Sequence, residues 1–386
     1  MKKIGIIGAG SMGRGIAQQA SVSGHEVVLV EIQEKTLNDA FAFIQKMINR
    51  FAEKGKMDNT EAVASIGRIY CSTYLSSLEK CDLVIEAVVE NLELKKSIFN
   101  KVESIVSADC ILASNTSSLS ITNIAGSLRH PERMIGIHFF NPVPLMKLVE
   151  IIPAIQTKLE YVEDCKSMMV GWGKYPVVAK DTPGFIVNKV ARPFYSEALR
   201  IYDEGIASIE DIDHAMTDLG GFRMGPFMLM DYIGNDVNYA VTESVFEAFY
   251  YDPRYKPSFT QKRLSEAGWL GRKSGRGYYT YVDGKPQKTQ EEFHYQKSTF
   301  QRILTMLINE AADTMHMGIA SRDDIDLAVT KGVNYPKGLL QWADEIGVGL
   351  VVNQLDELYH HYREDRYRCS GLLRTIAERQ STFYDA

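Results

Sequence analysis

The first 180 residues alternate short β-branched apolar runs with longer segments in which apolar residues recur at helical spacing. This alternation predicts a mostly parallel sheet with helices on both faces and right-handed crossovers. Ligands are then expected at the carboxyl ends of the strands. The predicted strands are Lys3–Ile7, Val27–Glu31, Ile69–Cys71, Leu83–Glu86, Ile111–Ala113, Met134–His138 and Leu148–Ile152, and the predicted helices are Met12–Val22, Leu37–Lys54 and Leu92–Val106.

The pattern changes at Asp181-Thr182-Pro183-Gly184. Pro183 is predicted to open a helix, whose apolar stripe continues to about Tyr202. The rest of the chain has helical patterns, and the polar stretch at residues 281–292 predicts a linker. We therefore expect an α/β Rossmann-type domain, residues 1–182, followed by an all-α part with an internal duplication.

The duplication is visible as a repeated motif. GIASIEDID at Gly205–Asp213 recurs as GIASRDDID at Gly318–Asp326, an offset of 113 residues. A register that persists over many residues indicates a duplicated helical unit, which we place at residues 183–285 and 294–386. The same offset pairs Glu197 with Glu310, Gly225 with Gly338, Asp231 with Asp344 and Gly234 with Gly347.

Composition narrows the possible functions. A net charge of −6 argues against a nucleic-acid groove, and no apolar run is long enough to span a membrane. The amino terminus runs directly into a strand and a glycine turn, unlike a secretory signal. The five cysteines have neither zinc nor redox spacing, so we expect reduced thiols, a cytoplasmic protein and no metal site.

Gly8, Gly10 and Gly13 fit the pattern G-x-G-x-x-G between a strand and a helix. These glycines permit a tight turn, close approach of a pyrophosphate and helix–strand packing. Glu31, at the end of the second predicted strand, can accept both adenosine ribose hydroxyls and would repel a 2′-phosphate. The sequence therefore predicts a dinucleotide site that prefers NAD to NADP.

His138 ends a predicted strand at the edge where ligands bind, although a lone histidine is more often structural. Glu150 lies twelve residues later in an apolar strand and needs a partner if it is buried. A Glu–His pair satisfies both side chains, because the carboxylate fixes the tautomer and stabilises the imidazolium. With a dinucleotide site, this pair predicts alcohol oxidation by hydride transfer.

Several polar residues have both a structural and a functional interpretation. Ser117 either caps a helix or lies at the ligand edge, and Asn188, on an apolar helix face, needs a partner such as a substrate carbonyl. Glu90 and Lys95 form either an ordinary pair at a helix start or a cofactor contact. Lys54 and Lys56 either lie at the solvated end of a helix or bind phosphate.

The motifs IGIIGAGSMGRGIA, DLVIEAVVENLELKK, SNTSSLSIT, HFFNPVPLMKLVE, KDTPGFIVN, MGPFMLMDYIG and GRKSGRGYY occur in order over residues 1 to about 281. Together they strongly resemble the 3-hydroxyacyl-CoA dehydrogenase family. The resemblance implies NAD-dependent, reversible oxidation of an (S)-3-hydroxyacyl-CoA to the 3-ketoacyl-CoA, in fatty acid or phenylacetate catabolism.

The resemblance also implies roles for individual residues. His138 would be the general base and Glu150 its partner, while Ser117 and Asn188 would contact the substrate. Lys54 would contact coenzyme A. The residues expected to bind the cofactor are Gly8, Gly10, Ser11, Met12, Gly13, Glu31, Glu90, Lys95, Asn115 and Lys273.

The resemblance leaves two alternatives for the acyl group of the substrate. VNKVARPFYSEA is similar to family members that act on 3-hydroxyadipyl-CoA, and Arg192 could bind a distal carboxylate, although a surface or interface role would also explain it. Enzymes acting on 3-hydroxybutyryl-CoA are equally similar. The same residues also allow a dehydrogenase of a free hydroxy or sugar acid on the same fold, or a noncatalytic NAD-binding interaction protein.

The second helical copy is expected to be noncatalytic, because Asn188 maps to Gln301 and no second glycine loop precedes it. In the short enzymes that the chain resembles, the helical domain forms the homodimer contact. We expect either a homodimer or, if the second copy replaces that contact within one chain, a monomer.

Overall fold

The computed structural model describes residues 1–289, 292–294 and 296–384. It divides into two compact units, Met1–Phe185 and Ile186–Ala386, and the break lies close to the predicted boundary after residue 182. Residues 290 and 291 of the predicted linker, and residues 295, 385 and 386 of the second helical copy, lie outside the described residues.

The first unit is built on a sheet with the strand order β3-β2-β1-β4-β5-β6-β7-β8. Neighbouring strands are parallel except for β6 and β7, which pair antiparallel. The order from β3 to β6 is that of a dinucleotide-binding fold, with a topological switch point between β1 and β4. The strands are β1 (Lys3–Ile7), β2 (Glu26–Val30), β3 (Ile69–Ser72), β4 (Leu83–Glu86), β5 (Ile111–Ser114), β6 (Met134–Phe139), β7 (Leu148–Pro153) and β8 (Tyr175–Val178).

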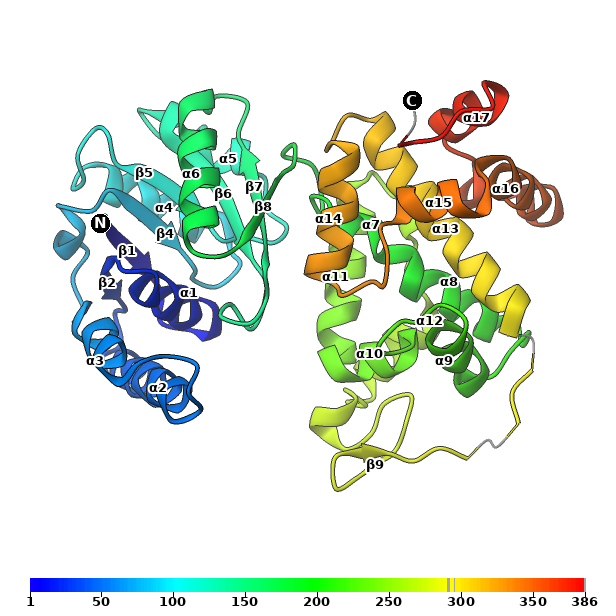
Figure 1. Ribbon diagram of the computed structural model, residues 1–386, viewed down its shortest axis with the longest axis horizontal. Coiled ribbons are helices and arrows are strands. Elements are labelled where there is room, and N and C mark those ends of the chain that lie inside the picture. Colours follow the sequence, from blue (N-terminus) through cyan, green and yellow to red (C-terminus); the bar gives the residue numbers. More distant parts are fainter. Residues whose placement is uncertain (290–291, 295, 385–386) are drawn as a thin grey trace. The chain divides into compact units, whose positions relative to one another are not determined.

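Helices cover both faces of this sheet, which is why strands such as β4 and β5 are buried at every position. One hydrophobic core joins the sheet to α1, α2 and α6, and Figure 1 shows α4 and α5 behind the sheet on its opposite face. The helices of this unit are α1 (Ser11–Val22), α2 (Glu34–Glu53), α3 (Asn59–Gly67), α4 (Leu92–Glu103), α5 (Ile121–Ala125) and α6 (Leu159–Gly171).

The predicted strands and helices of this unit are present, with ends that move by a few residues. The helices α3, α5 and α6 and the short edge strand β8 were not predicted. The helix expected to start at Pro183 is wrong in its start, because the first helical residue is Val187. Gly184 and Phe185 have φ angles of 73° and 48°, and a right-handed helix cannot begin before the chain leaves this left-handed conformation.

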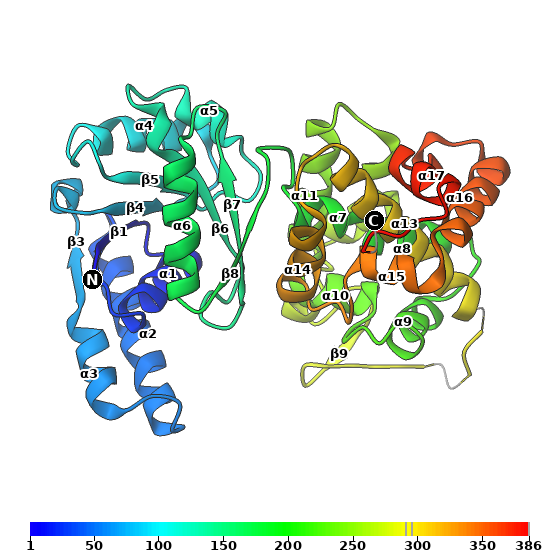
Figure 2. The same ribbon diagram turned by 45° about the horizontal axis from the view of Figure 1, so that its top comes forward.

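The second unit is helical. Its longest helix, α13, contacts α8, α9, α15, α16 and α17 and passes through the middle of the unit in Figures 1 and 2. The helices are α7 (Val187–Val190), α8 (Arg192–Asp203), α9 (Ile209–Asp218), α10 (Pro226–Ile233), α11 (Asn235–Ala248), α12 (Phe259–Glu266), α13 (Gln296–His316), α14 (Arg322–Gly332), α15 (Leu339–Ile346), α16 (Val348–Tyr362) and α17 (Gly371–Glu378).

Part of the predicted linker has regular structure. Residues Tyr281–Val282 (β9) and Lys285–Pro286 (β10) pair as a short antiparallel hairpin, and Asp283 and Gly284 have positive φ angles at its turn. The linker prediction is therefore wrong for residues 281–286. Polar composition did not distinguish a tight hairpin from an open segment, since both need turn residues.

The sequence repeat corresponds to a repeated set of hydrogen bonds. Asp213 accepts bonds from the backbone N–H groups of Phe227 and Met228 at 2.9 Å each, and from the Tyr279 hydroxyl at 2.8 Å. At the repeat offset, Asp326 accepts bonds of the same lengths from Leu340, Gln341 and the Tyr384 hydroxyl. In both copies, a buried carboxylate thus fixes the start of the next helix.

The glycines at the starts of these helices explain part of the repeated motif. A Cβ atom on Gly225 would lie 2.3 Å from Asp213, and one on Gly338 would lie 2.3 Å from Asp326. Neither position has room for a side chain beside the carboxylate. The repeat therefore preserves a packing arrangement as well as a sequence.

The two copies exchange ion pairs across the contact between α8 and α13. Glu197 of the first copy binds Arg302 at 2.6 Å, Arg366 at 3.2 Å and the Tyr367 hydroxyl at 2.9 Å. The equivalent carboxylate of the second copy, Glu310, binds three residues of the first copy with the same chemistry: Lys189, Arg254 and the Tyr255 hydroxyl. Such a reciprocal pattern is the mark of a twofold interface, here within one chain.

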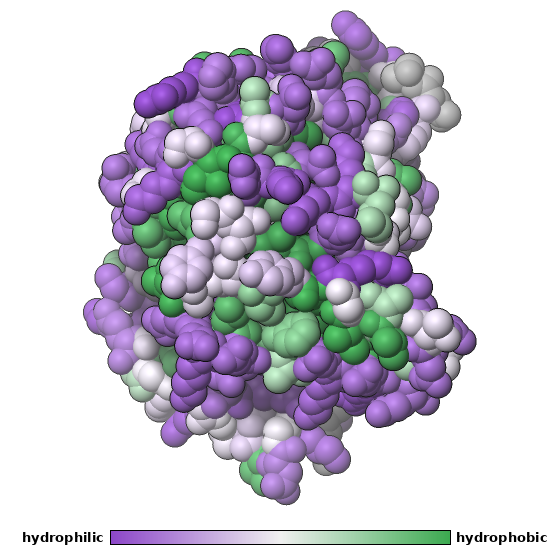
Figure 3. All heavy atoms as spheres, turned by 90° about the vertical axis from the view of Figure 1, so that its left-hand side faces the viewer, coloured by the Kyte–Doolittle hydropathy of each residue, from purple (hydrophilic) through white to green (hydrophobic). Residues whose placement is uncertain are grey.

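Among the residues that the structure describes, no helix has both the length and the apolar composition of a membrane span. Polar side chains dominate the face of the α/β unit shown in Figure 3, and apolar side chains gather in patches toward its centre. The exposed apolar residues of this unit include Ile32 and Val89, which follow β2 and β4.

Candidate active site

The glycine loop joins β1 to α1 at the carboxyl edge of the sheet. Gly8 has a φ of 98°, and a Cβ atom on Gly13 would lie 1.8 Å from the Gly8 carbonyl oxygen. A Cβ atom on Gly10 would meet nothing within 4 Å. The first and third glycines are thus required by the fold, whereas Gly10 borders open space at the amino terminus of α1, where a phosphate can approach.

Glu31 follows β2 and its carboxylate lies against the glycine loop. Its Oε2 accepts a hydrogen bond of 3.2 Å from Ala9 N–H, and its Oε1 accepts one of 3.1 Å from Gln33 N–H. The side chain is only half-buried, so lone pairs of both oxygens remain for further donors. This position suits the hydroxyls of an adenosine ribose.

His138 and Glu150 are directly opposite each other in the antiparallel pair β6–β7. Nδ1 of His138 lies 2.6 Å from Oε2 of Glu150, and the two residues are 6% and 0% exposed. The rings of Phe140 and Phe185 lie 4.5 and 5.9 Å from the imidazole, centroid to centroid. An imidazole that donates Nδ1–H to a buried carboxylate keeps the Nε2 lone pair for a proton.

The loop after β5 carries Asn115 and Ser117 to the same edge. Asn115 Oδ1 accepts a 2.9 Å bond from Phe139 N–H, next to His138. Glu90 holds the loop by accepting bonds from Thr116 Oγ1 at 2.5 Å and Ser117 N–H at 3.2 Å. Within the described part of the chain, the Ser117 hydroxyl has no hydrogen-bond partner and is available to a ligand.

Glu90 is held in its charged form. Burial acts to raise the pKa of Glu90, but Lys95 and the hydroxyls of Thr116 and Ser118 outweigh burial, and the net pKa is lowered. The Lys95–Glu90 pair, at 3.3 Å, was one of the two interpretations of these residues. A charged Glu90 is the better acceptor for the loop that carries Ser117.

Lys95 lies deeper than a simple cofactor contact would. It is 1% exposed, and its ammonium group lies 2.6 Å from Glu86, which is 0% exposed and also accepts a bond from Ser114. Lys95 thus sits beneath the carboxyl ends of β4 and β5 and reaches the ligand edge through Glu90. Its predicted role at the cofactor stays a prediction.

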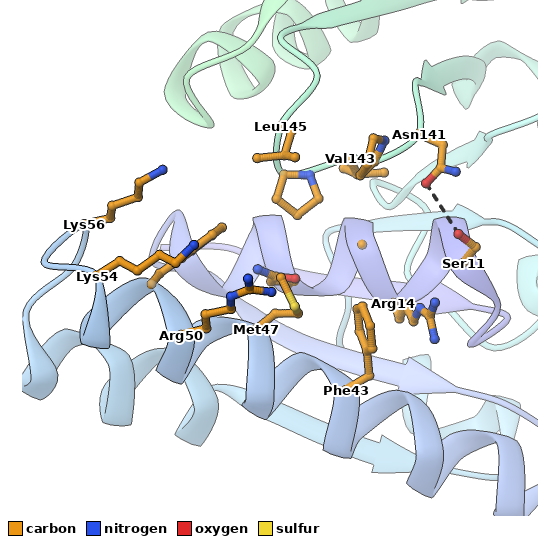
Figure 4. A pocket seen from close by; sticks show the side chains of 15 residues that line it. Ser11, Arg14, Phe43, Met47, Arg50, Lys54, Lys56, Asn141, Val143 and Leu145 are labelled. Carbon is orange, nitrogen blue, oxygen red and sulfur yellow. Dashed lines mark hydrogen bonds between the residues drawn. The ribbon is translucent and has the colours of Figure 1, made fainter. Parts of the chain in front are cut away.

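A cavity of about 600 Å³ opens beside the glycine loop within the α/β unit. Figure 4 shows Arg50, Lys54 and Lys56 toward one end and Ser11 and Asn141 at the other. Ser11 Oγ donates a hydrogen bond of 3.4 Å to Asn141 Oδ1. Apolar side chains line the space between the two ends: Phe43, Met47, Phe51, Val143 and Leu145. A long ligand with an anionic end and an apolar middle would fit this arrangement.

Several residues of this cavity were not predicted from the sequence. Asn141 precedes a cis peptide bond to Pro142. No sequence motif pointed to Arg50 or to Arg14, whose guanidinium lies 3.9 Å from the centre of the Phe43 ring. The spacing of Arg50 and Lys54, one helical turn apart at the end of α2, was the available signal.

Of the other predicted site residues, Met12 lies on α1 of the α/β unit, and Asn188, Lys273 and Arg192 belong to the helical unit. Asn188 lies half-buried on α7. Lys273 pairs with Asp236 at 2.6 Å and is 47% exposed. Arg192, at the start of α8, is buried, so the surface role considered for it is wrong.

Known families account for nearly the whole chain. The sequence profile described as "3-hydroxyacyl-CoA dehydrogenase, NAD binding domain" matches residues 3–182, and that of the C-terminal domain matches residues 184–281 and 299–382. The chain belongs to the 3-hydroxyacyl-CoA dehydrogenase family. The predicted family, fold class and NAD cofactor are thereby confirmed.

Relatives within the 3-hydroxyacyl-CoA dehydrogenase family differ in length and in the substrate for which they are named. A 3-hydroxyadipyl-CoA dehydrogenase of Escherichia coli K12 is 36% identical over 99% of both chains. A 3-hydroxybutyryl-CoA dehydrogenase of Bradyrhizobium diazoefficiens is 40% identical and covers 75% of this chain and 98% of its own. The crystal structure of a 3-hydroxybutyryl-CoA dehydrogenase from Escherichia coli K12 superposes with a TM-score of 0.92 at 36% identity, covering 98% of both chains.

Proposed function

We propose that this chain catalyses the reversible, NAD-dependent oxidation of an (S)-3-hydroxyacyl-CoA to the 3-ketoacyl-CoA. The observation that carries the proposal is the buried His138–Glu150 pair at the sheet edge that also holds the glycine loop. The activities for which the full-length relatives are named support it.

The residues at this edge fit bound NAD. The open space at Gly10 and the amino terminus of α1 suit the pyrophosphate, and Glu31 suits the adenosine ribose. Ile32 and Val89 are 81% and 71% exposed at the ends of β2 and β4 and offer apolar faces to the adenine ring. Bound NAD supplies the acceptor for the hydride that leaves C3 of the substrate.

Side chains of the protein would accept the proton of the C3 hydroxyl group. His138 takes the C3 hydroxyl proton at Nε2, and Glu150 stabilises the imidazolium that forms. The free Ser117 hydroxyl holds the reacting oxygen near His138, a positioning role that lowers the entropic part of the barrier. The predicted contact of Asn188 with the substrate is carried over from the family resemblance.

The cavity beside the glycine loop supports a coenzyme A thioester over a free acid. Its basic end, with Arg50, Lys54 and Lys56, suits phosphate groups, and its apolar middle suits the pantetheine arm. A free hydroxy or sugar acid would leave this cavity unused. The cavity thereby favours the acyl-CoA substrate over the free acids that the sequence also allows.

The test is the rate of NADH oxidation with acetoacetyl-CoA, with free acetoacetate and with the N-acetylcysteamine thioester of acetoacetate, which lacks the nucleotide and most of the pantetheine arm. We expect kcat/KM to be highest for acetoacetyl-CoA and lower for both truncated substrates. Preference for the free acid would favour a hydroxy-acid dehydrogenase. NADH binding without turnover of any substrate would favour a noncatalytic NAD-binding protein.

A further inference from the structure

Lys174 is a buried cation to which the proposed function gives no role. It lies between α6 and β8, is 4% exposed, and has no carboxylate partner among the residues that the structure describes. Its ammonium group donates hydrogen bonds to the carbonyl oxygens of Val143 at 2.5 Å and of Met146 at 2.8 Å. A buried ammonium group is costly when only neutral groups face it. These two bonds must therefore offset much of the cost of burying the charge.

The two carbonyl groups belong to the loop between β6 and β7, residues 140–147, which we call the cavity loop. In the described parts of the chain, no backbone N–H group donates to either carbonyl. Because β7 runs antiparallel to β6 and parallel to β8, the starts of β7 and β8 lie at the edge of the sheet where β6 ends. Lys174, directly before β8, therefore supports the cavity loop at the edge where ligands bind.

The cavity loop forms one wall of the cavity beside the glycine loop. Residues 141–145 line the cavity, whereas Lys174 does not, and Figure 4 shows Val143 and Leu145 across from the side chains of α2. Leu145 is 63% exposed, but Val143 is 1% exposed and packs on α1, where a Cβ atom on Gly15 would lie 3.1 Å from its side chain. Lys174 thus acts on the shape of the cavity from outside it.

The charge of Lys174 changes within a pH range that enzyme assays can reach. Burial lowers the pKa of Lys174 to about 8, and the positive charge of Lys147, on the cavity loop, acts in the same direction. No acidic group of the described residues offsets these two effects. A neutral amine is a weaker donor to a carbonyl oxygen than an ammonium group is. Above about pH 8 the cavity loop therefore loses part of its support.

We propose that Lys174 is a positioning residue whose ammonium group holds the cavity loop against α1, so that the cavity binds the coenzyme A part of the substrate most tightly while Lys174 is charged. The proposal rests on the proposed function, because it assigns the cavity to coenzyme A. The role concerns binding and not the transfer of hydride. Loss of the charge should therefore raise KM for the coenzyme A thioester and leave kcat nearly unchanged.

The experiment measures NADH oxidation with acetoacetyl-CoA and with the N-acetylcysteamine thioester of acetoacetate, from about pH 6 to about pH 9.5. The readout is the thioester ratio, which is kcat/KM for the first substrate divided by kcat/KM for the second. Both substrates carry the same acetoacetyl group, so effects of pH on that group, on His138 and on NADH cancel in the ratio. We expect the wild-type ratio to fall roughly tenfold as the pH rises through about 8.

Four variants assign this fall to Lys174. Lys174→Met should have a thioester ratio roughly tenfold below the wild-type value at pH 7, through KM for acetoacetyl-CoA, and the ratio should be constant with pH. Lys174→Arg keeps its charge over the whole range, so it should retain the high ratio without the fall. Lys147→Met removes the neighbouring charge and should move the fall to higher pH. Lys166→Met, at a lysine of α6 that pairs with Glu163, is the matched control and should follow the wild type.

The outcomes separate this proposal from the proposed function. A high wild-type ratio that is constant with pH, or that is unchanged in Lys174→Met, overturns this proposal alone. A fall near pH 8 that persists in Lys174→Arg also overturns it, because another group would then titrate. If Lys174→Met fails to fold, the pH dependence of the wild-type ratio decides. A wild-type ratio near one at every pH overturns the assignment of the cavity to coenzyme A and this proposal with it, and no turnover of either thioester overturns the proposed function.

Discussion

His138 has one ring nitrogen committed to the protein and one left for chemistry. Fully buried Glu150, on the strand that pairs with that of His138, lies 2.6 Å from Nδ1 and is placed to accept a hydrogen bond from Nδ1–H. A neutral imidazole in this position carries its lone pair on Nε2. Once the ring is protonated, its positive charge strengthens its electrostatic attraction to the Glu150 carboxylate. We expect the pair to act as a single unit in which Glu150 orients and stabilises and His138 moves the proton.

Replacement of His138 by Gln should lower kcat for acetoacetyl-CoA reduction by roughly 10²–10⁴-fold, because Gln keeps the polarity and approximate size but cannot take the proton. NADH affinity, measured by quenching of intrinsic fluorescence, should stay near the wild-type value. His130→Gln is the matched control, since His130 is an exposed surface residue paired with Glu132. Turnover of His138→Gln near the wild-type rate would remove His138 from the proposed mechanism.

Single residues were predictable from the sequence where their chemistry demanded a partner. A buried histidine and a buried carboxylate in adjoining apolar strands each needed one, which is why His138 and Glu150 could be paired. Lys95 shows the limit: its partner Glu86 ends an apolar strand, and nothing in the spacing indicated that the lysine would turn inward. The cavity residues Arg14 and Phe43 were missed because they meet only after two helices have packed.

Among the helices, α10 and α15 begin in the same way, each against a buried aspartate of the preceding helix. Asp213 accepts bonds from two N–H groups at the start of α10 and from Tyr279. Burial raises the pKa of Asp213 to about 7, although these donors act in the opposite direction. Burial likewise raises the pKa of Asp326, the equivalent residue in the second copy.

The raised pKa of Asp213 predicts a pH dependence of stability. Its pKa in the folded protein, about 7, lies above the ordinary value of 3.8. As the pH rises, the unfolded chain therefore loses this proton at a lower pH than the folded protein does. Between about pH 4 and pH 7 the native state binds more protons, and the contribution of Asp213 to the free energy of unfolding falls as the pH rises. We expect the free energy of unfolding of the wild type, measured with urea and relative to that of Asp213→Asn, to fall by a few kcal/mol between about pH 4 and pH 7. A difference that is constant with pH would contradict the prediction.

Helices and strands were predictable where one pattern dominated. The buried parallel strands are continuous β-branched runs, and the glycine loop marks the start of α1. The start of α7 was misplaced because proline is a good first residue of a helix, whereas the positive φ angles of Gly184 and Phe185 are set by how the chain leaves the sheet. The β9–β10 hairpin is too short to show an alternating pattern.

Across the whole chain, duplication has placed a twofold interface inside the helical unit. Glu197 and Glu310 are equivalent by the repeat, and each is held by a basic residue and an Arg-Tyr dipeptide of the other copy. The two carboxylates are 0% and 2% exposed. Two copies joined by buried, reciprocal ion pairs should unfold as one cooperative unit, because unfolding of either copy would leave buried charges of the other copy without partners.

This reciprocity can be measured with Glu197→Ala and Glu310→Ala. Each variant should lose about 3 kcal/mol of unfolding free energy, near the lower end for a broken buried pair, because Glu204 and Asp313 still pair with Arg302 and Lys189. Hydrogen exchange should show lost protection in α9 and α14 alike in either variant, since damage to one copy releases the other. Glu357→Ala, at an exposed carboxylate of α16, is the control and should change neither readout. Loss of protection confined to the mutated copy would show that the duplicate is an independent appendage, and the expectation that it replaces a dimer contact within one chain would lose its physical basis.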